Sequence, residues 1–308
     1  LGIVLAGTPV ARFPPPTLES VIHARDPSET TPMFAALEQL EEQDPLIDIR
    51  RGERDSSISL RLYGEVQKEV IEATLRDEYG IAVHFEPSQT ICIERVIGSG
   101  SAGEGMGGAN PFMAAVAFDV APGARDSGIT YHRQLGSLPL AFYRAIEETV
   151  RATLREGLLG WEVHDCDVTL TRVAFAPASA AGDFRHLTPL VLMEALRLAG
   201  TEVCEPIERF TLEVPLDAVG DAYGMLASVR ATPDETAQRG DTSRITGTIP
   251  SSEAHRFEQH LPALGRGEAV FTSAHAGYRP IRGTPPERAR TDFDPLNRKL
   301  YLALVSQS

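Results

Sequence analysis

Four consecutive residues, His164 to Asp167, form the densest group of potential metal ligands and nucleophiles in the sequence. They lie in a stretch, residues 162–174, whose polar and apolar residues alternate as in a β-strand. Because successive strand side chains point to opposite faces, His164 and Cys166 face away from Asp165 and Asp167. No second pair of Cys or His completes a set of four metal ligands. We therefore expect neither a metal site nor a catalytic residue here.

A glycine-rich run, residues 98–108, has the composition of a phosphate-binding loop. A P-loop requires the pattern GxxxxGK[ST], in which Lys contacts the β- and γ-phosphates and Ser or Thr holds magnesium. Neither residue follows the glycines. We expect a flexible surface hairpin or loop and no nucleotide or other cofactor site in this sequence.

The loop before Asp183 is small and uncharged. Residues 174–182 contain one aromatic, Phe175, and one proline, Pro177. Asp183 stands where a helix is predicted to begin, and its charge favours the helix dipole there. Nine residues is long for a strand-to-helix connection, and long loops on rigid scaffolds often carry function. Slim apolar loops can enter confined sites and stack on nucleobases.

The composition is that of a globular protein. The 308 residues include 29 Lys and Arg against 43 Asp and Glu, a formal net charge of −14. This balance argues against a general nucleic-acid binder, DNA included, because such binding needs clustered Lys and Arg. No run of about 18 apolar residues predicts a membrane span. Three scattered cysteines are typical of the reducing cytoplasm, and the start at Leu1 suggests a piece of a longer protein.

One stretch near the C-terminus is locally basic. Its six basic and three acidic side chains are Arg279, Arg282, Arg288, Arg290, Arg298 and Lys299 against Glu287, Asp292 and Asp294. These residues form either a solvated terminus or a surface that meets phosphate, and the sequence leaves both open.

The elements that position these residues fall into three blocks, which together predict an α+β multidomain fold. In residues 17–96 the pattern predicts strands at 18–23, 47–50, 58–63, 81–85 and 90–96 and two helices, one at 31–42 and one from about residue 66 that ends before Gly80. The order is β-α-β-β-α-β, the ferredoxin-like or split βαβ arrangement, with the final two strands read as one ribbon. Residues 206–278 repeat this order.

The middle block, residues 97–205, has a different pattern. It predicts strands at 112–120, 130–134 and 162–174 and helices at 140–158 and 184–198. The first residues read as the end of a strand, followed by a Pro-rich linker up to residue 16. Residues 279–308 read as a loose tail followed by a helix at 294–305.

Several segments together carry a resemblance to a known family over essentially the whole chain. They are Tyr63-Gly-Glu-Val-Gln-Lys-Glu-Val-Ile71, Asn110-Pro-Phe-Met113, Gly157-Leu-Leu-Gly-Trp161, Pro177-Ala-Ser179, Asp183-Phe-Arg185, Leu187-Thr-Pro-Leu-Val-Leu192 and Ala199-Gly-Thr-Glu202. With these segments the chain is similar to the C-terminal part of the tetracycline-resistance ribosomal protection proteins, relatives of the translational GTPase elongation factor G.

The resemblance implies a domain assignment and a function. Residues 17–96 and 206–278 correspond to the third and fifth domains of the family and residues 97–205 to its elongated fourth. Residues 1–16 correspond to the tail of the preceding, second domain and a linker. The fourth domain reaches the decoding region of the small ribosomal subunit, where a tip loop displaces tetracycline from rRNA; the large subunit is a second partner. GTP and Mg²⁺ belong to a GTPase domain outside this segment, so the segment itself is expected to be no enzyme, monomeric and cytoplasmic.

The resemblance also assigns site residues. The drug-displacing loop corresponds to Phe175, Ala176, Pro177, Ala178 and Ser179. Phe175 stands where the family has a tyrosine, Ala176 where a serine is common, and Ala181 replaces a second proline, so this tip is smaller and less polar. Two loops are expected to support it from the same end: one with Arg125, Asp126 and Ser127, and one with Ser137 and Leu138. Arg125 is the expected rRNA phosphate contact.

Two other functions remain open. One is an elongation factor G paralogue that acts in translocation, although translocases place a longer, polar tip loop here. The other is a stand-alone cytosolic α+β enzyme or metabolite-binding protein, for which the sequence offers no convergent titratable cluster.

Overall fold

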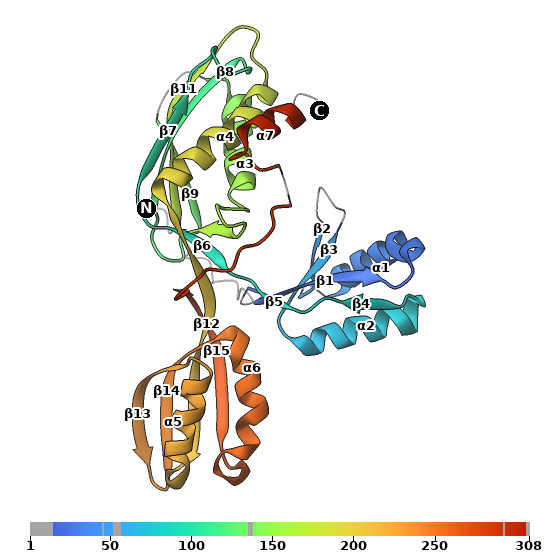
Figure 1. Cartoon of the computed structure of the whole chain (residues 1–308), viewed down its shortest axis with the longest axis vertical. Coiled ribbons are helices and arrows are strands. Elements are labelled where there is room, and N and C mark those ends of the chain that lie inside the picture. The colour runs from blue at the N-terminus through green and yellow to red at the C-terminus, as the bar shows by residue number, and fades with distance from the viewer. Residues whose placement is uncertain (1–14, 45, 52–56, 135–137, 292, 306–308) are drawn as a thin grey trace, which may run out of the picture. The chain divides into compact units, whose positions relative to one another are not determined.

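The computed structural model describes residues 15–44, 46–51, 57–134, 138–291 and 293–305 (Figure 1). The expected end of a preceding domain, residues 1–16, lies almost wholly outside these ranges. The described chain divides into two compact units. One draws on residues up to 50, 58–90 and 208–275, and the other on residue 51, residue 57, 91–207 and 276 onward.

The first block forms a small sheet covered by two helices. Its elements are β1 (Leu18–Ala24), α1 (Thr30–Gln43), β2 (Asp48–Arg51), β3 (Ile58–Leu62), α2 (Glu65–Tyr79), β4 (Val83–Phe85) and β5 (Gln89–Thr90). The strand order is β2-β3-β1-β4, and β5 also pairs with β1. Fully buried Leu37, Leu60 and Leu75 join both helices to the sheet. This order is the expected split βαβ arrangement.

The last block repeats that order. It consists of β12 (Thr201–Pro215), α5 (Val219–Ser228), β13 (Thr232–Arg239), β14 (Thr242–Pro250), α6 (Ser251–His260) and β15 (Val270–Pro280). The strands run in the order β12-β14-β13, and β15 also pairs with β12. Phe210, Leu226 and Phe257 are fully buried between the sheet and the two helices. The predicted repeat of topology is confirmed.

The middle block carries a four-stranded mixed sheet. Its elements are β7 (Gly100–Glu104), β8 (Ala114–Pro122), β9 (Ile129–Arg133), α3 (Leu140–Thr153), β11 (Cys166–Phe175) and α4 (Ala181–Ala199), and the strand order is β7-β8-β11-β9. β11 runs antiparallel to β8 and parallel to β9, because α3 carries the chain back between β9 and β11. Helices α3 and α4 cover one face (Figure 1), where Phe118, Ile146 and Phe184 are fully buried.

The predicted strand at 162–174 is two strands. β10 (Glu162–His164) pairs in parallel with β6 (Ile93–Val96), and β11 begins a separate pairing with β8. The chain turns between them at Asp165, which has a φ of 53°. The Asp165 carboxylate accepts a hydrogen bond from Arg95 Nε at 3.0 Å, and this buried pair holds the turn.

β6 does not belong to the sheet of the first block, contrary to the expected boundary at residue 96. It pairs with β10 and β12, and the two units separate after Thr90. The reason is the fully buried Glu94 on β6. Its carboxylate accepts the N–H groups of Leu158, Leu159 and Trp161 at 2.8–3.1 Å and the Thr201 hydroxyl at 2.6 Å.

The glycine-rich run supplies β7, which pairs antiparallel with β8, so the hairpin alternative holds and its first part is a strand packed on α4. A Cβ atom on Gly100 would lie 2.2 Å from the Ala195 carbonyl oxygen, and one on Gly98 would lie 2.9 Å from that of Ala199. The glycines therefore let β7 approach the backbone of α4, a contact that a larger residue blocks.

The basic tail is part of the second unit and pairs with acidic residues of that unit. Arg279 pairs with Glu205 at 3.0 Å, Arg290 with Glu156 at 3.6 Å and Arg298 with Glu104 at 2.6 Å. These three arginines are therefore held within the molecule, which neither interpretation of the sequence anticipated. The predicted helix at 294–305 begins only at residue 298, as α7 (Arg298–Val305). Within the described residues, no helix combines the length and the apolar character needed to cross a membrane.

Candidate functional site

Residues 175–180, called the tip loop below, connect β11 to α4 at one end of the middle sheet. The register fixes this position, because Phe175 is paired with Ala114, the first residue of β8. The chain immediately before Ala114, residues 105–113, therefore lies beside the tip loop. We call it the β7–β8 loop.

The tip loop is a turn closed by one serine. The Ala176 N–H donates to Ser179 Oγ at 2.8 Å, and the Ser179 N–H donates to the Ala176 carbonyl oxygen at 3.0 Å. The Ser179 hydroxyl in turn donates to the carbonyl oxygen of Met113 in the β7–β8 loop. Ser179 thus ties the turn to its neighbour.

Asp183 makes a second connection between the same two loops. One carboxylate oxygen accepts the Ala180 N–H at 2.7 Å, and the other accepts the Met113 N–H at 3.1 Å. Ala180 is the N-cap residue and Asp183 the third residue of α4, where a carboxylate that accepts the N-cap N–H stabilises the first turn. The helix begins three residues earlier than expected, so Asp183 is not the N-cap residue, but its carboxylate still stabilises the N-terminus of the helix as expected.

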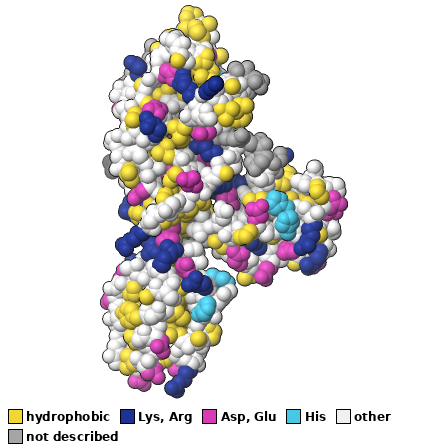
Figure 2. Space-filling model, in the orientation of Figure 1, with side chains coloured by type: hydrophobic (Ala, Val, Ile, Leu, Met, Phe, Trp, Pro, Cys, Tyr) yellow, Lys and Arg dark blue, Asp and Glu magenta, His cyan; other side chains and the backbone are white. Residues whose placement is uncertain are grey.

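The outward surface of the tip loop is apolar. Phe175 is 43% exposed and rests edge-on against Phe142, with ring centroids 6.0 Å apart. Phe142 packs in turn on the buried Phe184 at 4.9 Å. Pro177 and Ala178 are exposed, and Met113 beside them is 45% exposed. Figure 2 shows hydrophobic side chains gathered at this end of the middle block. Such a surface can stack and pack, but it carries no group for proton transfer or metal binding.

One of the two expected supporting loops lies at the wrong end of the sheet. Arg125, Asp126 and Ser127 follow β8, whose last residue, Pro122, is paired with Cys166 at the start of β11. The stretch from Cys166 to Phe175 spans about 30 Å of strand. Because β8 and β11 are antiparallel, a loop after β8 cannot meet a loop after β11. The expected support by Arg125, Asp126 and Ser127 is wrong.

The surroundings of Arg125 agree with that placement. Gly123 donates its N–H to the Asp165 carbonyl oxygen at 2.7 Å, which fixes this loop to the turn between β10 and β11. Burial raises the pKa of the Cys204 thiol to about 11, opposed by the positive charges of Arg95 and, more weakly, Arg125. Arg125 therefore lies near the start of β12, far from the tip loop.

Of the two residues expected in the second supporting loop, only Leu138 belongs to the described residues. β9 runs parallel to β11, and Gln134 donates its N–H to the Leu170 carbonyl oxygen as the chain leaves the sheet toward α3. Leu138 is partly buried against the core of the middle block. Ser137 lies outside the described residues.

Sequence reasoning missed the residues that hold the tip loop. Asn110, in the β7–β8 loop, donates from Nδ2 to the carbonyl oxygens of Gly105 and Ala114 at 2.8 and 2.9 Å, and its Oδ1 accepts the Phe112 N–H. Asn110 is buried, so it shapes the loop that presents Met113. The signal was present, because Asn110 to Met113 is one of the segments that carried the family resemblance.

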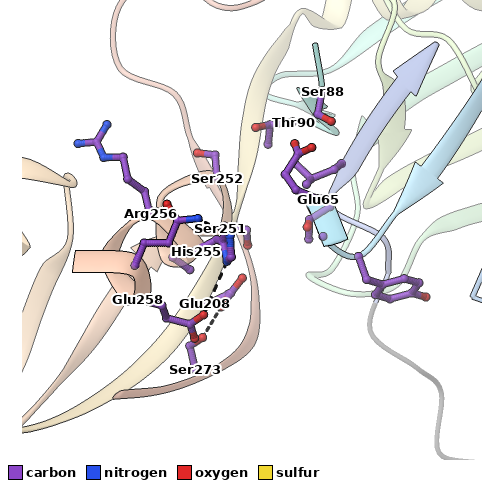
Figure 3. A pocket seen from close by; sticks show the side chains of 16 residues that line it. Glu65, Ser88, Thr90, Glu208, Ser251, Ser252, His255, Arg256, Glu258 and Ser273 are labelled. Carbon is purple, nitrogen blue, oxygen red and sulfur yellow. Dashed lines mark hydrogen bonds and ion pairs between the residues drawn. The ribbon is translucent and has the colours of Figure 1, made fainter. Parts of the chain in front are cut away.

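A pocket of about 420 Å³ in the first unit is lined mainly by charged and polar side chains, unlike the apolar tip loop (Figure 3). Two of its charged or titratable side chains are engaged with neighbours: Glu208 accepts from the Ser273 hydroxyl at 2.5 Å, and His255 lies 2.9 Å from Gln259. No set of three or more His, Cys, Asp or Glu side chains in the described part of the chain is placed to hold a metal ion. The tip loop remains the stronger candidate site.

Three family models match consecutive parts of the chain. Elongation factor G domain III matches residues 13–87, elongation factor G domain IV matches residues 105–200, and the elongation factor G C-terminus matches residues 202–289. These matches cover the first block, the middle block with the tip loop, and the last block.

Relatives are known as resistance proteins. The oxytetracycline resistance protein of Streptomyces rimosus is 47% identical over 302 residues, 95% of this chain and 46% of that protein. The tetracycline resistance protein TetM of Streptomyces lividans is 41% identical over 276 residues, 88% of this chain and 43% of that protein. The chain thus spans less than half the length of these relatives. A crystal structure of a protein from Thermus thermophilus has the same fold, with a TM-score of 0.62 at 21% identity over 97% of this chain and 44% of that one.

Proposed function

Because the chain belongs to the elongation factor G-like family of tetracycline resistance proteins, we propose that it is the ribosome-binding part of a ribosomal protection protein. In this proposal the tip loop enters the decoding region of the small subunit and displaces tetracycline from rRNA. The large subunit is a second contact, and the protein acts as a monomer in the cytoplasm. GTP and Mg²⁺ are bound by another domain of the longer protein.

The observation that carries this proposal is the apolar, pre-formed tip loop. Pro177 and Ala178 are exposed at its outer end, while Ser179 and Asp183 hold the backbone from inside. A drug competes for one position on rRNA, so a displacing loop needs a fixed shape and a surface that packs on a base. A net charge of −14 does not oppose this, because the loop needs no charge of its own.

The test is a chimera in which this chain replaces the matching part of the Streptomyces rimosus protein. Translation in a reconstituted system with oxytetracycline is measured for the parent chimera and for Pro177→Gly combined with Ala178→Gly. We expect the double variant to lose most of the rescue, because two glycines remove both the packing surface and the backbone rigidity.

The matched control is Ser127→Gly in the loop at the opposite end of the same sheet, which should leave rescue unchanged. Full rescue by the Pro177 and Ala178 variant would show that the tip loop does not displace the drug.

A further inference from the structure

Helix α7 reaches the tip-loop end of the middle block through a forked ion pair. Arg298 donates from Nη1 to one oxygen of Glu104 at 2.8 Å and from Nη2 to the other at 2.6 Å. Nη2 also donates to the Ala109 carbonyl oxygen at 3.1 Å. A two-point guanidinium–carboxylate pair fixes orientation as well as distance. Arg298 therefore binds both the end of β7 and the β7–β8 loop.

A second contact joins α7 to the start of α4. Tyr301 is 6% exposed, and its hydroxyl donates to the His186 carbonyl oxygen at 3.0 Å. The His186 ring packs against Phe112 of the β7–β8 loop, with centroids 5.6 Å apart. Tyr301 thus holds the first turns of α4 close to the β7–β8 loop, which Arg298 also contacts.

These contacts form a continuous connection to the tip loop. Arg298 fixes Ala109, the next residue is the buried Asn110 that shapes the β7–β8 loop, and that loop presents Met113. Both tip-loop ties, from Ser179 and from Asp183, end on the backbone of Met113. Nothing in this connection requires contact between α7 and the tip loop itself.

We propose that Arg298 and Tyr301 are positioning residues that set the conformation of the tip loop through the β7–β8 loop and the first turns of α4. Only the consequence of this arrangement for translation rests on the proposed function. A tip loop whose supports are released samples more conformations and loses the fixed shape that displacement of a bound drug requires.

Hydrogen exchange on the 308-residue chain tests the positioning role. The reporters are the N–H groups of Ala176, Ala180 and Met113, each of which donates to a side chain of the network. In Arg298→Ala and in Tyr301→Phe we expect these amides to exchange about five- to thirtyfold faster. Amides of the β8–β11 ladder should keep their rates, because a merely structural role would accelerate the whole middle block.

The matched control is Arg197→Ala. Arg197 also makes a two-point pair with a carboxylate, from Nε and Nη2 to Glu194 at 2.8 and 2.7 Å, but both residues lie within α4 near its C-terminal end. This variant should leave the three reporter amides unchanged. Exchanging the partners, Glu104→Arg with Arg298→Glu, should restore much of the slow exchange that Arg298→Ala loses.

Unchanged exchange at Ala176, Ala180 and Met113 in Arg298→Ala would overturn the proposal, as would equal acceleration throughout the β8–β11 ladder. The chimera separates this proposal from the proposed function. Faster exchange at the reporters with intact rescue of translation would support the positioning role and contradict drug displacement by the tip loop.

Discussion

At the scale of single residues, the tip-loop residues that are exposed to solvent differ from the residue that holds the loop backbone in place. Pro177 and Ala178 face solvent, whereas the Ser179 hydroxyl is directed back onto Met113. The five residues that the family resemblance groups together therefore have different roles. Support comes from short polar side chains that satisfy backbone groups, so the exposed surface remains apolar and uncharged.

Asp183→Ala tests this support. The substitution leaves the N–H groups of Ala180 and Met113 without their acceptor, so the free energy of unfolding of the middle block should fall by about 1–2 kcal/mol. Urea unfolding measures it. Asp119→Ala is the control, because Asp119 is exposed on β8. The free energy of unfolding of this variant should stay within about 0.5 kcal/mol of that of the parent chain. Equal losses would mean that Asp183 does not hold the loop.

At the scale of elements, the close approach of β7 to α4 sets where the β7–β8 loop begins. Gly100 permits this approach, and Glu104 at the end of the same strand receives Arg298. At the other edge of the sheet, β9 leads into α3, which carries Phe142. The Phe142 ring packs against that of Phe175. Three elements thus support the tip loop: β7, α3 and α4. They lie far apart in the sequence.

Gly100→Ala should destabilise the middle block by about 1–3 kcal/mol, because the new methyl group would lie 2.2 Å from the Ala195 carbonyl oxygen and 2.5 Å from the Ala199 nitrogen. Thermal unfolding by circular dichroism measures the change. Gly105→Ala in the next turn is the control, since a Cβ there has nothing within 4 Å, and it should be neutral. A neutral Gly100→Ala would show that β7 can move away from α4 at no cost.

At the scale of the whole molecule, the described residues form three large cores, one under each sheet, and a small fourth cluster around Trp161. The tail adds hydrogen bonds and ion pairs to the second unit. Glu156 illustrates both kinds of contact. It accepts the Thr291 N–H at 3.0 Å and pairs with Arg290, and both charged side chains are largely buried. Acidic residues of the second unit are thereby matched by tail arginines, so net charge says little about local binding.

The three cysteines should be inert in the folded chain. Burial raises the pKa of Cys92 and of Cys166 to about 12 and that of Cys204 to about 11. Ellman's reagent at about pH 8, below the usual thiol pKa, should react with them only after unfolding. A thiol that reacts as fast as a free one in the native chain would contradict the placement of that cysteine.

The same burial gives a pH dependence. Unfolded thiols ionise near about pH 8.5 while the folded ones stay protonated, so unfolding releases protons above that pH. The contribution of these thiols to the free energy of unfolding should therefore be unchanged below about pH 8.5. Above that pH the free energy of unfolding should fall toward pH 11–12, by up to about 1.4 kcal/mol per pH unit for each thiol. Replacing Cys166 by Ala should flatten the alkaline side of a urea-stability profile measured from about pH 8 to about pH 10.5.

The sequence by itself determined the element order, the two split βαβ blocks and the loop before Asp183, because hydrophobic periodicity and capping are local properties of the chain. It did not determine the break at Asp165 or the transfer of β6 to the second unit, since both depend on buried partners distant in sequence, Arg95 and the 158–161 backbone. Which loops share an end of the middle sheet was likewise decided only in the tertiary structure. Strand direction separates Arg125 from Phe175 by the length of β11 and brings Met113 and, through α7, Arg298 to the tip-loop end.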